Sequence, residues 1–266
     1  MIRRMLLALA FAATLAAQTF IQMSDPQFGM FTENKAFDHE TANFEFAVAT
    51  ANRLKPAFVV LTGDLVNAAG DAAQIAEFKR VAARLDPNIR LFLMPGNHDV
   101  GNEPTRESLV KYRKQFGPDY YTFRVGGITG IVLDSSLEKD PHNVPGEAAK
   151  MEAWFRTELA QAVRDQHVIV IQHIPFFLNA ANEEDRYENI PRETRQRYLK
   201  LLHQYGVQQV FAGHYHSTSE ARDGDLEMIT TGPVGKPVSP ARSGLQIVTV
   251  TPAGVAHKYY DFGDLP

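Results

Sequence analysis

The sequence contains no cysteine among its 266 residues. Disulfide bonds and lipidation at cysteine are therefore impossible, so an exported form of the protein would depend on its core and on any bound metal for stability. The same absence restricts metal ligands to imidazole, carboxylate, amide and water. Charge is nearly balanced, with 27 lysines and arginines against 31 aspartates and glutamates. The net charge of −4 lacks the basic surplus typical of nucleic-acid-binding proteins, so we expect no nucleic-acid binding.

One apolar run, residues 5–17, is longer than the others, yet it is shorter than the roughly 20 residues that span a bilayer. It follows two arginines and ends at the small residues Ala16 and Ala17, a pattern typical of a secretory signal peptide. We therefore expect residues 1–17 to be a cleaved signal peptide and the protein to be secreted or periplasmic, without a stable membrane anchor. An uncleaved anchor or a first core helix is the alternative. Without the two arginines, 25 basic and 31 acidic residues remain, a net charge of −6.

Short apolar runs alternate along the chain with segments in which apolar residues recur every three or four positions. The apolar runs predict buried strands at 19–23, 58–62, 89–93, 168–171, 207–211, 226–231, 245–250 and 255–260. The periodic segments predict amphipathic helices at 37–54, 71–85, 104–116, 146–165 and 191–205. Two further strands at 120–125 and 128–133 flank Gly126-Gly127, which predicts an antiparallel hairpin. This alternation predicts one α/β domain over residues 18–266.

Five of the predicted strands end in side chains that can bind a metal. The segments that follow them are Asp25-Pro26-Gln27, Gly63-Asp64, Gly96-Asn97-His98-Asp99, His173 and Gly213-His214-Tyr215-His216. Ligands in α/β proteins bind outside the carboxyl ends of the strands, where loops can converge on a rigid sheet. We therefore expect one site with five contributing segments.

Each of these residues also has an ordinary structural explanation. A lone histidine such as His173 is more often a hydrogen-bonded core residue, and Asp25 and Asp64 could cap helices, worth about 1 kcal/mol each. Helix caps do not explain Gly63 or the neighbouring histidines, and the position of His173 between the other motifs favours a ligand over a core histidine. The remaining histidines lack such a context and are expected to lie on the surface or in the core: His39, His142, His167, His203 and His257.

The ordered set of five segments resembles the motifs of the calcineurin-like metallophosphoesterases, and it spans most of the mature chain. Three longer segments resemble a subgroup, the calcineurin-like phosphoesterase domain-containing protein 1 type, also described as complete-type Ser/Thr protein phosphatases. These segments are Ser24–Gly29, Gly96–Asn102 and Gln172–Pro175. The resemblance implies a layered α/β/β/α sandwich of two mixed sheets flanked by helices.

The resemblance also implies two divalent metal ions, of Mn, Fe or Zn, bridged by Asp64. It assigns Asp25, Gln27 and His216 to one ion. It assigns Asn97, His173 and His214 to the other ion. Most family members carry a histidine where this chain has Gln27, and an amide oxygen is a harder and weaker ligand than imidazole. We therefore expect that ion to bind less tightly, or to be a harder ion such as Mn or Mg.

Phosphate esters resist nucleophilic attack because their oxygens are negatively charged, and two cations can neutralise that charge while generating hydroxide. The expected reaction is hydrolysis of phosphomonoesters by attack of a metal-bridging hydroxide. His98 is expected to act as general acid toward the leaving oxygen, a role that suits an imidazole. Asp99 is expected to orient His98 by holding one ring nitrogen protonated.

Two other functions are also compatible with the sequence. One is a phosphodiesterase that acts on nucleotides or lipid head groups. The other is a non-catalytic, metal-stabilised binding module, which only the glutamine at Gln27 favours. The substrate is expected to be a small organic phosphate or a phosphoprotein, and export favours the small organic phosphate. The acidic segment 183–185 is expected to be a solvated loop, and Phe176 and Phe177 are expected to pack in the core.

Overall fold

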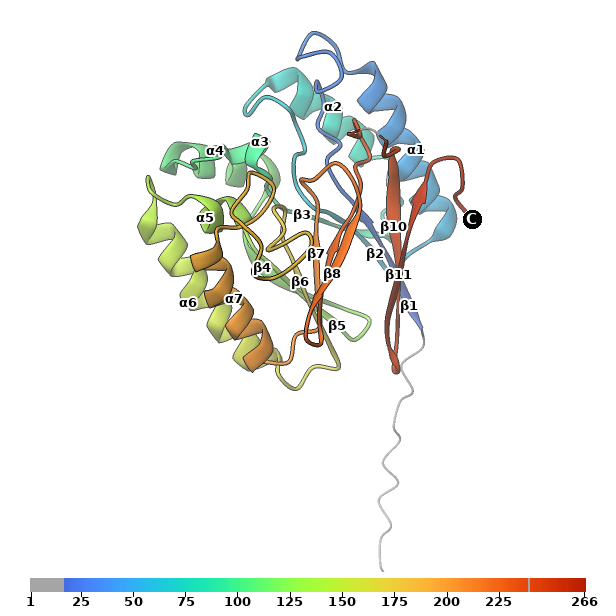
Figure 1. Ribbon diagram of the computed structural model, residues 1–266. Coiled ribbons are helices and arrows are strands. Elements are labelled where there is room, and N and C mark those ends of the chain that lie inside the picture. Colours follow the sequence, from blue (N-terminus) through green and yellow to red (C-terminus); the bar gives the residue numbers. More distant parts are fainter. Residues whose placement is uncertain (1–16, 239) are drawn as a thin grey trace, which may run out of the picture.

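Two β-sheets pack face to face in the computed structural model, which describes residues 17–238 and 240–266 (Figure 1). The first sheet has the order β11 (Gly254–Asp261), β10 (Gly244–Thr251), β1 (Gln18–Met23), β2 (Phe58–Leu61) and β3 (Arg90–Leu93). The second has the order β4 (Tyr121–Val125), β5 (Ile128–Val132), β6 (His167–Ile171), β7 (Gln209–Ala212), β9 (Leu226–Thr230) and β8 (Ser219–Asp223). Both sheets mix parallel and antiparallel pairs.

Helices cover the outer faces of both sheets (Figure 1). The first sheet is covered by α1 (Asp38–Leu54) and α2 (Ala72–Ala82), and the second by α6 (Pro145–Ala162) and α7 (Arg192–Gln204). Three others lie near the loops: α3 (Asn97–Val100), α4 (Arg106–Phe116) and α5 (Ser135–Lys139). The architecture is the α/β/β/α sandwich expected from the motifs.

Aromatic side chains hold the two sheets together. The rings of Phe92 and Phe123, from opposite sheets, stack with their centroids 3.7 Å apart. Phe58 meets Phe123 edge to face at 5.2 Å, and Phe20 meets Phe211 in the same way at 5.5 Å. Such pairs contribute about 0.5–1.5 kcal/mol each beyond the burial of their area. This contact layer fixes the two sheets relative to each other, and with them the loops at their edges.

The parallel strands of each sheet direct their carboxyl ends to one rim. In the first sheet β1, β2 and β3 are parallel, and in the second β5, β6, β7 and β9 are parallel. A hydrogen bond from Gln22 Nε2 at the end of β1 to the carbonyl of Ala212 at the end of β7, 2.8 Å long, joins the two sheets there. The segments that follow these strands therefore converge on one place.

The structure confirms the predicted strands and the hairpin at Gly126-Gly127, and it differs from the prediction in a few elements. The edge strand β8 was missed because its residues are half-exposed or exposed and give no apolar pattern. The predicted helix 146–165 ends at Ala162, so Val163 lies outside it and is exposed. Phe176 and Phe177 are fully buried, as expected.

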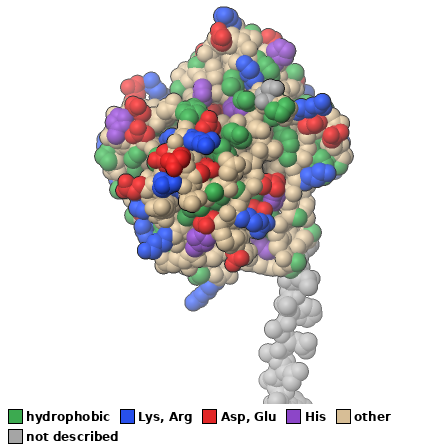
Figure 2. Space-filling view, viewed as in Figure 1, with side chains coloured by type: hydrophobic (Ala, Val, Ile, Leu, Met, Phe, Trp, Pro, Cys, Tyr) green, Lys and Arg blue, Asp and Glu red, His purple; other side chains and the backbone are tan. Residues whose placement is uncertain are grey.

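No helix within the described ranges is both long enough and apolar enough to cross a membrane. Of the predicted signal peptide, residues 1–16 lie outside the described part of the chain, so this prediction is not tested by the fold. Figure 2 shows Lys and Arg interspersed with Asp and Glu over the face in view, in keeping with the nearly balanced composition.

Two buried carboxyl groups beside α5 give the fold a pH dependence. Asp134 and Glu138 are buried, and neither oxygen of Glu138 has a hydrogen-bond partner among the described residues. Burial raises the pKa of both groups well above their usual values. The folded state therefore keeps a proton that the unfolded state releases. The resulting stability is complete below the usual glutamate pKa of 4.5 and is lost as the pH rises through the raised folded pKa.

We expect Glu138→Gln to raise the free energy of unfolding at pH 8 by about 1–3 kcal/mol, because the amide is neutral in both states and folding no longer has to take up a proton at this position. At pH 5 the variant should match the parent protein. Urea unfolding at both pH values measures the difference, with Glu193→Gln, an exposed substitution, as the matched control. An equal increase in the free energy of unfolding at both pH values would contradict a raised pKa for Glu138 in the folded protein.

Candidate metal centre

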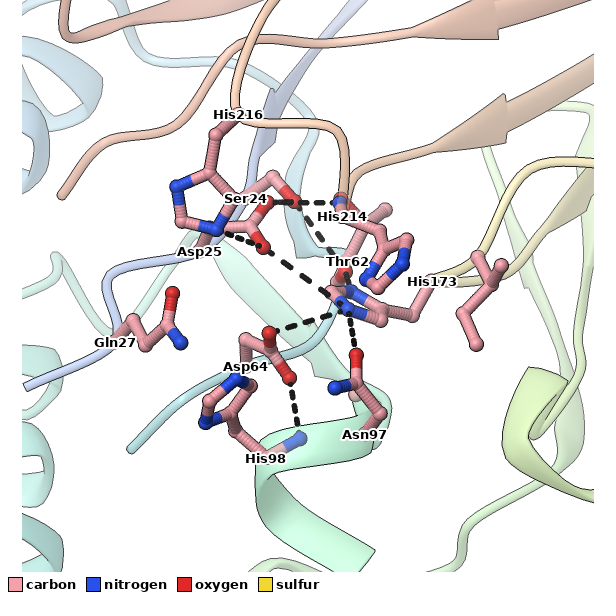
Figure 3. A network of polar contacts seen from close by, with 12 residues as sticks. Ser24, Asp25, Gln27, Thr62, Asp64, Asn97, His98, His173, His214 and His216 are labelled. Atoms are coloured by element: carbon pink, nitrogen blue, oxygen red, sulfur yellow. Dashed lines mark hydrogen bonds and ion pairs between the residues drawn. The ribbon is translucent and has the colours of Figure 1, made fainter. Parts of the chain in front are cut away.

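The segments that follow five strands of the two sheets meet at one rim (Figure 3). Asp25 follows β1 and Asp64 follows β2, while Asn97 begins α3 shortly after β3. From the second sheet, His173 follows β6, and the His214 segment follows β7. The structure thus brings together all five segments that the sequence predicted to form one site.

Two glycines allow these segments to approach closely. A Cβ atom at Gly96 would lie 2.1 Å from Oδ1 of Asp64, and one at Gly63 would lie 2.6 Å from Nδ1 of His173. Neither distance is possible for real atoms, so any side chain at these positions would push the segments apart. The glycines of the motifs are required by this packing.

Two groups of three side chains could each hold a cation, and Asp64 belongs to both. In the first group, ligand atoms of Asp64, His173 and His214 all lie within 4.8 Å of one another. In the second, the same holds for Asp25, Asp64 and His216. All of these side chains are buried. A carboxylate shared by two ligand sets is the arrangement expected of a bridging residue.

The carboxylates each use one oxygen within the protein. Oδ1 of Asp64 accepts the backbone N–H of His98 at 2.8 Å, while Oδ2 lies 3.3 Å from Nε2 of His173. Oδ2 of Asp25 accepts the hydroxyl of Ser24 and the backbone N–H of His214. Oδ1 of Asp25 has no hydrogen-bond partner among the described residues. One oxygen of each carboxylate is thus directed to the shared space.

The histidines are oriented in the same way by backbone carbonyls. Nδ1 of His173 donates to the carbonyl of Thr62 at 2.6 Å, and Nδ1 of His216 donates to that of Lys236 at 2.5 Å. In both rings Nε2 is left facing the carboxylates. Histidines that bind metals almost always donate their other ring N–H to such a partner, which fixes the ring and its tautomer.

The two predicted amide ligands differ in their contacts. Oδ1 of Asn97 lies 3.1 Å from Nε2 of His173, which places it with the first group. Nε2 of Gln27 donates to Oδ1 of Asn67 at 3.1 Å, and Oε1 of Gln27 is buried without a hydrogen-bond partner in the described part of the chain. A buried polar oxygen without a partner is costly, and a cation would supply the partner that Gln27 and Asp25 lack. The residues present therefore fit divalent metal ions.

The backbone at the site is strained. Five of the predicted ligand residues have positive φ angles: Asp25 (49°), Gln27 (41°), Asp64 (50°), His214 (68°) and His216 (54°). A non-glycine residue in a sparsely populated backbone region costs of the order of 1–3 kcal/mol, and such residues cluster at functional sites. These backbone conformations therefore lower the stability of the fold, and they direct the five side chains toward one point.

Electrostatics favour a positive charge in the centre. Burial acts to raise the pKa of Asp64, but the charge of His173 and its contact with Asp64 hold that pKa well below its usual value. Burial acts to lower the pKa of His173, yet the carboxylates of Asp64 and Asp25 raise it to about 9. Burial, with the charge of His173, lowers the pKa of His214 to about 4. A bound cation would replace the proton on His173, because ligation requires a neutral imidazole.

The expected role of Asp99 in orienting His98 is wrong. The carboxylate of Asp99 instead accepts backbone N–H groups of Leu65, Val66 and Gly96 at 2.8–3.2 Å. Burial, together with the charge of Asp64, raises the pKa of Asp99 to about 7. Asp99 thus joins the turn after β2 to the turn after β3, which a position next to His98 in sequence does not reveal.

His98 is oriented by a backbone carbonyl. Its Nδ1 lies 2.9 Å from the carbonyl oxygen of Asn67. Its side chain lines a cavity of about 270 Å³ that opens on the candidate centre. The residues that line this cavity are Gln27, Met30, Asp64, His98, Tyr187, Glu188, His214, Tyr215, His216 and Val238.

Sequence reasoning missed Tyr187, which contacts two predicted ligands. Its hydroxyl oxygen accepts a hydrogen bond from Nδ2 of Asn97 at 3.0 Å, and its backbone carbonyl oxygen lies 3.2 Å from Nε2 of His214. It belongs to the loop after β6 that also contains the acidic segment 183–185. In that segment Glu184 is exposed as expected, but Glu183 accepts backbone N–H groups within the loop. No local sequence pattern marks Tyr187, because its role depends on how this loop folds over the site.

The chain matches the family model described as "Calcineurin-like phosphoesterase" over residues 19–218. Serine/threonine-protein phosphatase CPPED1 of Danio rerio is 34% identical over 263 residues, covering 92% of this chain and 85% of that protein. CPPED1 of Homo sapiens is 34% identical over 264 residues, covering 92% of this chain and 84% of that protein.

The structure is similar to the crystal structure of a dimetal phosphatase from Danio rerio, with a TM-score of 0.61 and 16% sequence identity. The superposition covers 93% of this chain and 100% of that chain. At this identity the likeness shows the fold alone. The family model and the relatives of similar length show more, because they extend over the segments that build the centre. The chain belongs to the calcineurin-like phosphoesterase family and is a metallophosphoesterase.

Proposed function

We propose that this metallophosphoesterase is a phosphatase that hydrolyses phosphate monoesters with two divalent cations held side by side. The observation that carries the proposal is the membership of Asp64 in both three-residue groups. Two cations in such a site would neutralise the phosphoryl oxygens and supply a nucleophile from water at neutral pH. The named phosphatases among the relatives support this class of reaction.

The geometry supports a division of the ligands between the two ions. One ion would be held by Asp25, Gln27 and His216 with Asp64. The other would be held by Asn97, His173 and His214 with Asp64. Mn, Fe and Zn all suit a mixed set of imidazole and oxygen ligands. Because Gln27 offers an amide oxygen, we expect the ion at that position to be held less tightly or to be a harder ion such as Mn or Mg.

His98 is the proposed general acid. Its Nδ1 faces the carbonyl of Asn67, so its Nε2 is the nitrogen available to the cavity. Attack on phosphorus forms one phosphorus–oxygen bond with the oxygen of water, and the bond to the ester oxygen breaks. The protonated ring would give its Nε2 proton to that departing oxygen, which then leaves as an alcohol.

The monoesterase can be tested against a diesterase in one assay. The protein is loaded with Mn, Fe or Zn, and its turnover of 4-nitrophenyl phosphate is compared with that of bis(4-nitrophenyl) phosphate. We expect the monoester to be hydrolysed faster with at least one metal. Faster turnover of the diester would favour the alternative phosphodiesterase. A binding module is not favoured, because His98 faces the cavity and the relatives are named as phosphatases.

The location of the protein is also a proposal. We infer export through a signal peptide at residues 1–17, and β1, which begins at Gln18, would remain intact after cleavage. In an exported protein a small organic phosphate is a more natural substrate than a cytoplasmic phosphoprotein. Intact-mass analysis of the exported protein should give a chain that begins at Gln18. A chain that retains residues 1–17 would contradict the signal peptide.

Tyr187 is expected to support metal binding through Asn97. Its hydroxyl oxygen accepts Nδ2 of Asn97 and so keeps Oδ1 turned toward His173. We expect Tyr187→Phe to weaken binding of one metal ion about tenfold, within the range typical of residues that orient a ligand. Competition titration with a chelator measures this affinity.

Tyr215→Phe is the matched control for Tyr187→Phe. Tyr215 lines the same cavity, but the hydroxyl that accepts the hydrogen bond from Asn97 is that of Tyr187 and not that of Tyr215. We expect this control to keep the parental metal affinity. Equal metal affinity in Tyr187→Phe and Tyr215→Phe would contradict the role of Tyr187.

A further inference from the structure

Exposed apolar side chains gather around the mouth of the candidate site. Six large hydrophobic side chains of the described residues are exposed: Phe46, Val110, Val163, Tyr187, Tyr215 and Val238. Three of the six, Tyr187, Tyr215 and Val238, line the cavity that opens on the metal centre, and Met30 adds a fourth apolar side chain to its wall. Exposed hydrophobic side chains scattered singly need no explanation, but a cluster at one cavity marks a binding surface.

The charges that line this cavity are unsuitable for a second anionic group. Among the described residues that line it, none is a lysine or an arginine. The carboxylates are Asp64 at the centre and Glu188 on the wall. The transferred phosphate would be neutralised by the cations and by His98, but a further phosphate or carboxylate on the substrate would meet Glu188 without a positive partner. Placing like charges together in a partly desolvated pocket costs binding energy.

We propose, given the phosphatase function above, that the site selects monoesters whose leaving group is uncharged and apolar or aromatic beside the phosphate. Burial of such a group against Met30, Tyr187, Tyr215 and Val238 removes apolar surface from water. The cavity of about 270 Å³ limits how much of the group can be enclosed. Nucleotides, sugar bisphosphates and other polyanionic esters are then poor substrates.

A homologous series of n-alkyl phosphates, from ethyl to octyl, tests this selection. All members have nearly the same leaving-group acidity, so the chemical step stays constant and any trend reports binding of the alkyl chain. We expect kcat/KM to rise about threefold to fourfold for each enclosed methylene. The rise should level off once the chain is longer than the cavity. An ω-carboxyalkyl phosphate should be at least about tenfold poorer than the alkyl phosphate of equal length.

Binding of n-alkylphosphonates provides a second readout, because these analogues are not hydrolysed. Their Kd, measured by calorimetry on the metal-loaded protein, should fall along the series in the same proportion. Val238→Ser should flatten both trends, while Val110→Ser, which removes an exposed valine on α4 outside this cavity, should leave them unchanged. Glu188→Gln should improve turnover of the ω-carboxyalkyl phosphate alone.

The source of such a leaving group, a polypeptide or a small ester, can be tested with two phosphoserine peptides. In one peptide leucine flanks the phosphoserine, and in the other aspartate does; their kcat/KM values are compared with that of octyl phosphate. Preference for the leucine peptide over octyl phosphate would point to a polypeptide source, and the reverse to a small ester. Equal kcat/KM and equal Kd along the alkyl series would overturn the inference while leaving the phosphatase function intact. Phosphonate binding that follows the series, without hydrolysis of any ester, would instead refute the phosphatase function and keep the apolar selection.

Discussion

The Asp64→Asn variant is expected to lose more than roughly a thousandfold in kcat/KM, beyond the 10–100-fold typical of residues that only orient a ligand. Asp64 is the residue common to both candidate cation groups, and asparagine removes its charge and puts an amide nitrogen in place of the oxygen directed to the shared space. The remaining Oδ1 can still accept the backbone N–H of His98, so the local fold should persist. We expect metal analysis of the purified variant to show less than one ion per chain.

The matched control for this loss is Asp71→Asn. Asp71 caps α2 by accepting the backbone N–H groups of Ala73 and Gln74, and asparagine caps helices equally well. This control changes the same functional group without touching the centre, so its activity and metal content should stay at the parental level. Full metal content in Asp64→Asn, or activity within about tenfold of the parent, would contradict a bridging role for Asp64.

The His98→Ala variant is expected to lose about 10²–10⁴-fold in kcat on alkyl phosphates while keeping its metal ions. The backbone N–H of His98 still donates to Asp64, and the side chain is only partly buried, so the change removes the proton donor with little effect on the fold. The loss should be much smaller with 4-nitrophenyl phosphate, because 4-nitrophenolate leaves without needing a proton.

The comparison of two leaving groups separates proton donation from positioning. His142→Ala is the control, since His142 is exposed and, among the described residues, forms ion pairs with Asp140 and Glu103 alone. It should behave as the parent with both substrates. A loss in His98→Ala that is equal for alkyl and nitrophenyl esters would show that His98 binds the phosphate instead of donating a proton to the leaving oxygen.

The strand ends could be predicted because their signals are local. Five of the apolar runs are followed within a few residues by a carboxylate, an amide or an imidazole, and parallel strands bring these positions to one rim of the sheets. The hairpin at Gly126-Gly127 was equally accessible, since two glycines between two apolar runs specify a turn. At these positions a local sequence pattern predicts both the strand and the residue at which it ends.

Other features depend on tertiary placement and left no local signal. Tyr187 reaches Asn97 and His214 only because the loop after β6 folds over the centre. The sequence predicts that Asp99 orients its neighbour His98, whereas in the structure its carboxylate accepts backbone N–H groups from the turn after β2. The carbonyl of Asn67 that orients His98 comes from the same turn.

Anomalous diffraction from crystals of the protein soaked in Mn²⁺ tests the central claim most directly. We predict two peaks at the rim of the sheets, about 3.5–4 Å apart, with Asp64 between them. One peak should lie beside Asp25 and His216, and the other beside His173 and His214. A single peak, or peaks remote from Asp64, would contradict a centre of two cations bridged by that carboxylate.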